Sequence, residues 1–366
     1  MGRASGGGAR RVIKYLGSKR TLVPAILEVA RAVPGARTVV DLFSGTARVG
    51  HALKAAGYRV RANDHLAYAH ALARCYVEAD RERHARDAER LIAELNALPG
   101  RAGWFTETFC ERARYFQPKN GARIEAIREA IARKGLPPVL EAVLLVALLE
   151  AADRVDSTTG VQMAYLKQWA PRAHKDLALR LPALLPRAAA GAGEAHDLDA
   201  LEAAAALDGD VAYLDPPYNQ HSYLGNYHVW ETLVRWDAPA VYGTAMKRAD
   251  CRERRSPFNS RRRFRDAYAR LVAAVRAPVL IASFSDEGFL TRVELEALLA
   301  TRGRVHVLAH DHRRYVGARI GIYDPRGRKV GTPGRLRNTE YLFVVAPEGV
   351  TLAGLAEPPA ARQVLP

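Results

Sequence analysis

The 366-residue chain contains little cysteine and no long apolar run. Its three cysteines, Cys75, Cys110 and Cys251, are far apart and form no C-x-x-C pair. The sequence therefore indicates neither a zinc cluster nor a disulfide framework, and we expect a cytoplasmic protein without a metal site. The apolar stretch VLEAVLLVALLEAA (139–152) contains two glutamates and is shorter than a membrane span, so it predicts a buried helix. No secretory signal is recognisable, and no membrane partner is expected.

Glycine is scarce where a phosphate-binding loop would need it. The turn DLFSGT (41–46) has the single glycine Gly45, whereas dinucleotide-binding turns have G-x-G-x-x-G and P-loops end in G-K-[ST]. A pyrophosphate ligand is therefore disfavoured, and the turn favours a cofactor with a ribose and an amino-acid tail. Asp41 is placed to hold an ammonium group, and Asp64 is placed to bind ribose hydroxyls. For either aspartate alone, a helix cap or a turn is the alternative interpretation.

Acidic residues are outnumbered by basic ones, 39 against 55, which gives a formal net charge of +16. This excess favours a polyanionic partner such as nucleic acid. The basic residues gather in 247–270 and 302–337, where aromatic residues lie among them. An ordinary solvated surface is the alternative interpretation of both clusters. Within them, the residues that we expect to contact nucleic-acid phosphates are Arg255, Arg261, Arg262, Arg263, Arg313 and Arg314.

The pattern of strands and helices predicts an α/β fold that a helical block interrupts. RTVVDLF (37–43), a following helix and YRVRAND (58–64) form a β–α–β unit, which implies a parallel sheet. Residues 70–188 read almost entirely as helices. Four later segments predict strands, namely DVAYLD (210–215), PVLIASF (278–284), GRVHVLAH (303–310) and EYLFVV (340–345). We therefore expect a discontinuous catalytic domain (12–75 and 189–346), a helical target-recognition insert (76–188) and flexible tails (1–11 and 352–366).

One predicted strand ends abruptly in the segment DVAYLDPPY (210–218). Pro216 and Pro217 lack an amide donor and cannot continue a sheet ladder, so Asp215 must lie at the carboxyl end of the strand. Open α/β sheets bind their ligands at that edge. An ordinary strand-ending turn is the alternative interpretation of the tetrapeptide DPPY. That alternative is disfavoured because the candidate cofactor turn DLFSGT and Asp64 precede DPPY in the order expected of a single site.

These motifs resemble those of one enzyme family. DLFSGT resembles the S-adenosylmethionine motif of methyltransferases, and DPPY resembles the catalytic motif of enzymes that methylate exocyclic amino groups. The segment IKYLGSKRTLVPAIL (13–27) precedes both, as in the Dam-like, alpha-group N6-adenine DNA methyltransferases. The resemblance extends over most of residues 12–345. RARYFQPKNGARIEAIR (112–128) and TTGVQMAYLK (158–167) further resemble a subgroup of restriction-modification methyltransferases.

The resemblance implies a Rossmann-like S-adenosylmethionine-dependent methyltransferase sheet with an inserted, mostly helical subdomain. Asp197 would read the adenine amino group of the cofactor, although Asp199 is close and His196 stands where the family has a glycine. A monomer that acts on double-stranded DNA, accompanied by a cognate restriction endonuclease, is a further implication. The implied cofactor-binding residues are Tyr15, Lys19, Asp41, Phe43, Gly45, Asp64, Asp197 and Asp215.

The resemblance assigns catalysis to Asp215, Pro216, Pro217 and Tyr218. The lone pair of an adenine amino nitrogen is delocalised into the ring, which makes this nitrogen a poor nucleophile. Asp215 and the carbonyl of Pro216 can each accept one N–H bond, so that the lone pair becomes available for attack on the sulfonium methyl group. Tyr218 can stack on a base that is flipped out of the duplex. No cysteine lies nearby, which argues against methylation of a cytosine ring carbon.

Residues that read the DNA sequence are expected in the helical block. The loop NQHSYLGNYHVWETL (219–233), which contains Tyr223, is expected to close over the flipped base or to touch DNA. A polar loop that leads into a helix from Asn226 is its alternative interpretation. The candidate base readers are Arg112, Tyr115, Lys119, Asn120, Lys167 and Gln168, and a solvated helix face is the alternative for each of them.

Three functions are compatible with these motifs. The first is a DNA N6-adenine methyltransferase. The second keeps the reaction but acts on adenine in RNA or on the N4 amino group of cytosine. The third is a nucleic-acid-binding protein without turnover, against which the intact residues Lys19, Asp41, Asp64 and Asp215 argue. The large insert between the cofactor turn and DPPY favours the first function.

Overall fold

The computed structural model describes residues 13–17, 19–313, 322–323, 329–331, 337–350 and 352. The predicted tail 1–11, residues 353–366 of the second tail, and Arg314 lie outside the described residues. Arg313 is placed as part of a strand, but its side chain is not described. No described helix combines the length and the apolar character that crossing a membrane requires.

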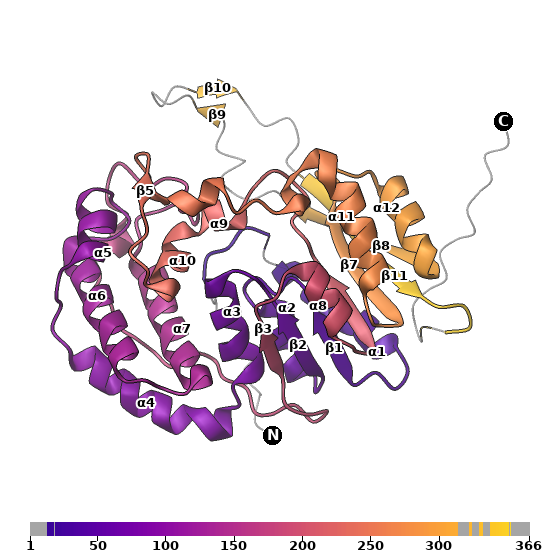
Figure 1. Cartoon of the computed structure of the whole chain (residues 1–366), viewed down its shortest axis with the longest axis horizontal. Coiled ribbons are helices and arrows are strands. Elements are labelled where there is room, and N and C mark those ends of the chain that lie inside the picture. Colours follow the sequence, from indigo (N-terminus) through magenta and orange to yellow (C-terminus); the bar gives the residue numbers. More distant parts are fainter. Residues whose placement is uncertain are drawn as a thin grey trace, which may run out of the picture.

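A seven-stranded sheet forms the centre of the fold, in the order β3-β2-β1-β4-β7-β11-β8 (Figure 1). The strands β3, β2, β1, β4 and β7 pair in parallel, and β11 is antiparallel to both of its neighbours. This arrangement confirms the predicted α/β class. The strand bounds are β1 Thr38–Asp41, β2 Arg59–Asn63, β3 Glu194–His196, β4 Val211–Leu214, β7 Val279–Ser285, β8 Arg304–Arg313 and β11 Arg337–Ala346.

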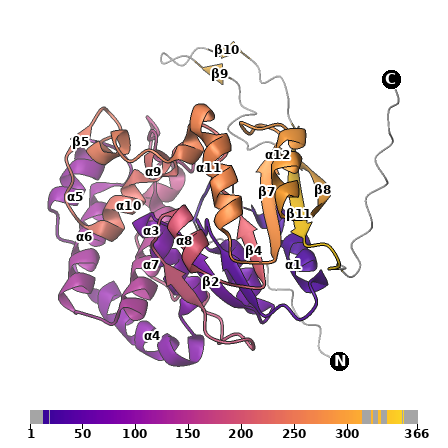
Figure 2. The same ribbon diagram turned by 45° about the vertical axis from the view of Figure 1, so that its right-hand side comes forward.

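The central strands are buried on both faces, because successive side chains point to opposite sides of the sheet. In β4, Val211 and Tyr213 join one hydrophobic cluster, whereas Ala212 and Leu214 join another. The first cluster includes residues of α1 (Val23–Ala32), α2 (Arg48–Ala55) and the helical lobe. The second includes residues of α8 (Ala200–Ala206), α11 (Arg261–Ala274) and α12 (Arg292–Leu299), which lie along one side of the sheet in Figure 2.

Beside the sheet lies a group of helices, called the helical lobe (Figure 1). The 18-residue helix α7 is almost entirely buried within it, as its apolar sequence predicts. The first hydrophobic cluster contains residues of both α7 and the sheet, so the lobe and the sheet share a continuous core. The helices of the lobe are α3 Ala67–Ala73, α4 Arg81–Ala97, α5 Trp104–Thr106, α6 Pro118–Arg133, α7 Pro138–Val155 and α10 His228–Arg235.

The prediction of helices over almost all of residues 70–188 is wrong for its last part. After α7 the chain contains no α-helix until α8, and its regular structure there is limited to a short 3-10 helix (Pro171–His174) and the strand β3. The physical reason is visible in the hydrogen bonds. Backbone groups of this stretch pair with other segments, for example Ser157 N with Tyr115 O at 2.8 Å and Leu179 N with Asn96 Oδ1 at 2.9 Å.

Candidate active site

A cleft lies at the carboxyl ends of β1 and β4, where the strand order reverses. The connection from β1 leads to β2 on one side, whereas β4 and β7 continue the sheet on the other. Ligands of open α/β sheets bind at this kind of switch point. The cleft encloses about 1040 Å³, part of which is open to solvent. The predicted site residues that line it are Tyr15, Lys19, Asp41, Phe43, Gly45, Asp64, Asp215, Pro217 and Tyr223.

Asp41 is the last residue of β1, and its side chain is buried in the wall of the cleft with 1% of its surface exposed. Among the described residues, neither of its carboxylate oxygens has a hydrogen-bond partner. Burial raises the pKa of Asp41 to about 8, and the negative charges of Asp215 and Asp64 add to this rise. The amide of Phe43 and the hydroxyl of Ser44 are near enough to offset part of it, but neither reaches Asp41 in hydrogen-bonding geometry. A cation bound in the cleft would compensate this carboxylate.

The turn after β1 is held against the end of β2. Asp64 Oδ2 accepts a hydrogen bond from the amide of Gly45 at 2.9 Å, and Oδ1 accepts one from the amide of Leu66 at 3.0 Å. Gly45 has φ +53°, a conformation that favours glycine. These contacts fix the orientation of the Asp64 carboxylate toward the cleft, and each oxygen keeps a lone pair for a further donor.

Asp215, the first residue after β4, is held through one oxygen. Its Oδ1 accepts a hydrogen bond from Ser283 Oγ at 2.7 Å and lies 3.1 Å from Lys19 Nζ. Tyr213 in turn donates its hydroxyl proton to Ser283 Oγ at 3.2 Å. These partners from the described residues all act at Oδ1 directly or through Ser283, which leaves Oδ2 as the oxygen available to a ligand. Burial raises the pKa of Asp215, and Lys19 and Ser283 counteract part of that rise.

Lys19 is buried in the same corner of the cleft, with 6% of its surface exposed. Its Nζ lies 3.9 Å from Glu340 Oε2 and 5.5 Å from the centre of the Tyr218 ring, in addition to its contact with Asp215. Burial acts to lower the pKa of Lys19, but Asp215, Tyr218 and Glu340 outweigh it and hold this pKa well above its usual value. Lys19 therefore stays charged and favours the ionised form of Asp215.

Aromatic rings close the other side of the cleft. Tyr15 stacks on Tyr223 with ring centres 5.2 Å apart, and on Tyr227 with ring centres 4.5 Å apart. The Tyr15 hydroxyl lies 3.3 Å from that of Tyr68. Tyr223 thus lies against the predicted cofactor residue Tyr15, within the cleft. Tyr218 does not line the cleft, and its ring packs at 52° against Phe284 beside Lys19.

Comparison with known proteins agrees with this geometry. A sequence profile of D12 class N6 adenine-specific DNA methyltransferases matches residues 15–271, which include every cleft residue named above. The chain belongs to this family. The resemblance to adenine-specific DNA methyltransferases, inferred from the DLFSGT and DPPY motifs, is thereby confirmed.

Individual relatives include Type II methyltransferases. The chain is 31% identical over 310 residues to the Type II methyltransferase M.FokI of Planomicrobium okeanokoites. The aligned residues cover 80% of this chain and 47% of that protein. It is 29% identical over 315 residues to the Type II methyltransferase M.NlaIII of Neisseria lactamica. This alignment covers 83% of this chain and 92% of that protein. The chain therefore spans about half the length of the first relative and nearly all of the second.

Within the family, the acid before α8 requires a correction. Asp197 is not among the residues that line the cleft, and its side chain is 72% exposed. Asp199 lines the cleft instead, and it also caps α8 by accepting a hydrogen bond from the amide of Leu201 at 2.9 Å. The side chain of Asn63, another cleft residue that the sequence analysis missed, holds this loop through the amide and carbonyl of Leu198.

The basic run 247–270 also contributes to the core, against expectation. Phe258 is buried and packs edge-to-face against Phe43, with ring centres 5.3 Å apart. Ser256, Phe258 and Asn259 line the cleft together with Arg254. The predicted phosphate-contacting residues of this run, Arg255, Arg261, Arg262 and Arg263, are exposed.

The candidate base readers divide into exposed and buried residues. Arg112 and Lys167 are exposed, and exposed Lys119 forms an ion pair with Asp176 at 2.6 Å. Asn120 is 1% exposed, and its amide group bonds to the backbone of Ala173, Lys175 and Leu177. The assignment of Asn120 to base reading is corrected, because a buried and saturated amide is not available to DNA. Tyr115 is likewise buried.

Proposed function

We propose that this chain transfers a methyl group from S-adenosylmethionine to the N6 amino group of adenine in double-stranded DNA. Membership of the family supports the reaction and the type of nucleic acid. The observation that supports the mechanism is the arrangement of Asp215, which lines the cleft and whose Oδ1 is held by Ser283 and Lys19, so that Oδ2 is left for a ligand.

The cleft residues fit the proposed cofactor. The unpartnered carboxylate of Asp41 is suited to its ammonium group, and Asp64, already oriented by two amides, is suited to its ribose hydroxyls. Asp199, at the start of α8, is in place for a polar edge of its adenine ring. When bound, the cofactor supplies a positively charged sulfonium whose methyl carbon is open to attack by a nucleophile.

At the catalytic corner, the chain would orient the amino group that is methylated. Asp215 Oδ2 and the Pro216 carbonyl accept its two N–H bonds, which frees the nitrogen lone pair for the methyl carbon. The amino group would lose a proton as its nitrogen takes up the methyl group, and Asp215 can accept that proton. Lys19 keeps Asp215 ionised before the reaction, because their charges lie 3.1 Å apart.

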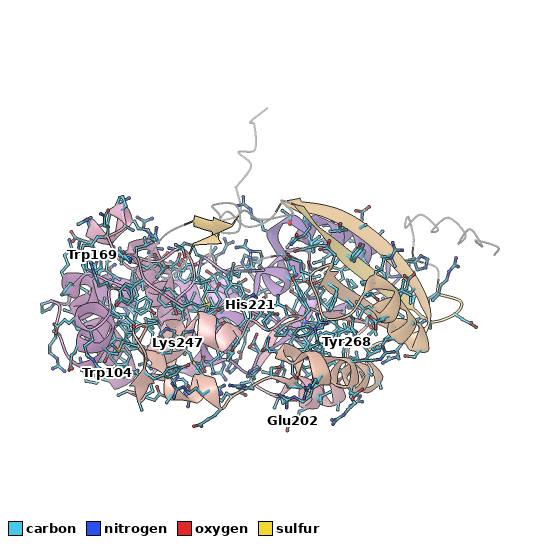
Figure 3. All side chains as sticks on the ribbon, turned by 90° about the horizontal axis from the view of Figure 1, so that it is seen from above. Trp104, Trp169, Glu202, His221, Lys247 and Tyr268 are labelled. Atoms are coloured by element: carbon cyan, nitrogen blue, oxygen red, sulfur yellow. The ribbon has the colours of Figure 1, made fainter. Side chains whose placement is uncertain are left out.

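Binding of DNA is proposed along the side of the molecule that carries the loop 219–233, which follows the DPPY motif. Seen from above in Figure 3, His221 of that loop lies between Trp169 of the helical lobe and Tyr268 of α11. The exposed arginines 255 and 261–263 lie in the run that leads into α11. Because such side chains contact phosphates, they would add affinity for any duplex without reading its sequence.

The decisive experiment is to incubate the purified protein with duplex DNA and methyl-labelled S-adenosylmethionine, and to digest the DNA to nucleosides for mass spectrometry. Labelled N6-methyladenine is the expected product. Labelled N4-methylcytosine would show that the target base is cytosine and not adenine, with the same mechanism of methyl transfer to an amino group. Absence of any labelled nucleoside with DNA, followed by a labelled product with RNA, would overturn the proposed substrate.

A monomeric state, a companion endonuclease and a cytoplasmic location stay predictions. Size-exclusion chromatography with light scattering tests the first of them, and a dimer in the presence of DNA would contradict it.

A further inference from the structure

A loop of the helical lobe combines an exposed apolar side chain with positive charge. Residues 157–170, called the 157–170 loop, follow α7, and the loop is closed by Ser157, whose carbonyl accepts from Leu166 N at 2.9 Å and whose hydroxyl accepts from Ala170 N at 3.1 Å. Met163 is 47% exposed and is one of three large apolar side chains that are exposed among the described residues. The exposed residues near it in the chain are Thr159, Ala164, Lys167 and Gln168.

The chemistry of this surface suits a DNA duplex. The guanidinium of Arg114 lies 4.6 Å from the centre of the Trp169 ring and also donates to the carbonyl of Lys167, so the loop is bordered by cations. Glutamine pairs with adenine edges, methionine inserts between base steps or contacts thymine methyl groups, and lysine contacts phosphates or guanine. Trp169 lies at the outer part of the helical lobe in the view from above (Figure 3).

Inside the loop, Gln162 is buried and bonds to the segment that follows the DPPY motif. The Gln162 amide donates to the carbonyl of Asn226 at 2.7 Å. Its side-chain Oε1 accepts from the amides of Val229 at 2.9 Å and Trp230 at 3.3 Å. Its own carbonyl accepts from Tyr115, whose hydroxyl lies 2.7 Å away. The backbone N–H, the backbone carbonyl and the side-chain oxygen of Gln162 are therefore all hydrogen-bonded.

These bonds stabilise a junction between two helices. The chain turns from α9 (Tyr223–Asn226) into α10 at Tyr227, where no side chain of the junction itself caps α10. Such a junction leaves a carbonyl at the end of one helix and amides at the start of the next without helical partners. Gln162 supplies both kinds of partner, so it caps α10 from a segment 67 residues away in the chain.

The junction leads directly to the active site. Tyr223, the first residue of α9, lines the cleft and stacks on Tyr15. His228, the first residue of α10, is fully buried, and its Nε2 lies 2.9 Å from the Gln162 carbonyl. Burial lowers the pKa of His228 to about 3, so this ring stays neutral and donates to Gln162 at any pH at which the enzyme works. A displacement of the loop is thus transmitted to α9 and Tyr223.

We propose that the 157–170 loop reads base pairs of the target duplex, and that Gln162 is a positioning residue that couples this reading to the placement of Tyr223 in the cleft. The inference rests on the proposed function, since it assumes that duplex DNA is the substrate. It predicts that the wrong sequence is rejected at the methyl-transfer step as well as in binding. Met163, Lys167 and Gln168 provide the contacts, and Gln162 transmits them.

The test compares two substitutions of the same side chain. Gln162→Met keeps the length but removes the acceptor, and leaves the amides of Val229 and Trp230 without a partner. Gln162→Glu keeps an acceptor, and its negative charge is favoured at the start of α10. The duplex probes come from sequencing DNA that the wild-type protein has methylated, which gives the cognate site, and from changing one base pair of that site. Methylation rates are measured at saturating cofactor for each duplex.

We expect Gln162→Met to lower the ratio of cognate to altered-site kcat/KM by about tenfold, chiefly through the cognate kcat. Affinity for the cofactor should stay within about twofold of the wild type, since Gln162 does not line the cleft. Gln162→Glu should restore most of the ratio. Equal losses on both duplexes in Gln162→Met, with the ratio unchanged, would show a merely structural role and overturn the coupling.

A surface variant keeps the inference falsifiable if the buried variant fails to fold. The combined change Met163→Ala, Lys167→Ala and Gln168→Ala alters exposed side chains and should lower the same ratio. Val293→Ala, which removes an apolar side chain that is 73% exposed on α12, is the matched control and should leave the ratio unchanged. An unchanged ratio in the triple variant would overturn the reading role of the loop. Failure of the wild type to methylate any duplex would instead overturn the proposed function.

Discussion

Strand β1 ends in Asp41, and Asp215 directly follows the neighbouring strand β4, but the two carboxylates lie in different surroundings. Asp41 is buried, and neither of its oxygens has a hydrogen-bond partner among the described residues. Asp215 has Lys19 and Ser283 at one oxygen. Burial raises the pKa of both, so burial alone does not distinguish them. Under the proposed function the difference suits two tasks: Asp41 would bind a cation that the ligand brings, whereas Asp215 would orient a neutral amino group.

The largest expected effect separates catalysis from cofactor binding. Asp215→Asn should reduce methyl transfer by about a thousandfold, because Ser283 and Lys19 hold the amide oxygen at the position of Oδ1, so that an NH2 donor replaces the acceptor Oδ2. Its affinity for S-adenosylmethionine should change only a few-fold, since Asp41 and Asp64 are intact. Rates come from incorporation of labelled methyl groups, and affinity comes from calorimetry. Wild-type rates in this variant would remove Asp215 from the mechanism.

The second prediction concerns the loss of folding stability caused by the buried, unpartnered carboxylate of Asp41. Asp41→Asn should weaken cofactor binding strongly, yet stabilise the protein without cofactor. The pKa of Asp41 is about 8 in the folded protein and about 3.8 for an unperturbed aspartate, so the stability contribution of this group is complete below about pH 4 and is lost as the pH rises toward 8. Asparagine avoids this loss, which corresponds to about 3–4 kcal/mol near neutral pH.

Urea unfolding at pH 5 and pH 8 measures this effect. The gap in unfolding free energy between Asp41→Asn and the wild type should be wider at pH 8. Asp64→Asn is a suitable control, because Asp64 is held by two amides and its replacement should bring no such gain. A variant that is less stable than the wild type at both pH values would contradict the account of Asp41.

The third prediction concerns the pH dependence of cofactor binding. Between pH 7.5 and pH 6 the wild-type affinity should fall roughly 20-fold, because Asp41 takes up a proton while the cofactor ammonium keeps its own. In Asp41→Asn the affinity should be nearly constant over the same range. Calorimetric titrations at the two pH values decide this, and a flat profile for the wild type would exclude Asp41 as the ammonium partner.

The smallest expected effect concerns the hydrogen bond that Ser283 donates to Asp215. Ser283→Ala removes the hydrogen bond that lowers the pKa of Asp215, and we expect kcat to fall by about tenfold with KM little changed. The acid limb of the pH–rate profile should move to higher pH. Ser283→Thr keeps the hydroxyl and should restore both properties. An unaltered profile in Ser283→Ala would show that Lys19 alone controls Asp215.

The parts of the site that the sequence made predictable share one physical property. Asp41, Asp64 and Asp215 each lie at or directly after the end of a strand, so the strand pattern alone places them at one edge of the parallel sheet. The apolar pattern likewise predicted α7 and six of the seven strands of the sheet.

The parts that escaped prediction depend on contacts between distant segments. The strand β3 has three residues, all half-buried, so it lacks an apolar run, and the choice between Asp197 and Asp199 depended on it. Phe258 lies in a basic run whose composition indicated surface, and only its packing against Phe43 reveals burial. Ser283 did leave a signal, since a serine within a strand that is buried along its whole length needs a polar partner.

The position of β11 between β7 and β8 has a consequence for synthesis of the protein. Because β8 precedes β11 in the chain and pairs with no other strand among the described residues, it emerges from the ribosome before its partner strand exists. It stays without that partner until residues 337–346 have been made. Glu340, which lies 3.9 Å from Lys19 Nζ, arrives with the same strand. A nascent chain therefore completes its sheet and the charge balance around Lys19 in a single late step, so unfinished chains are expected to be inactive.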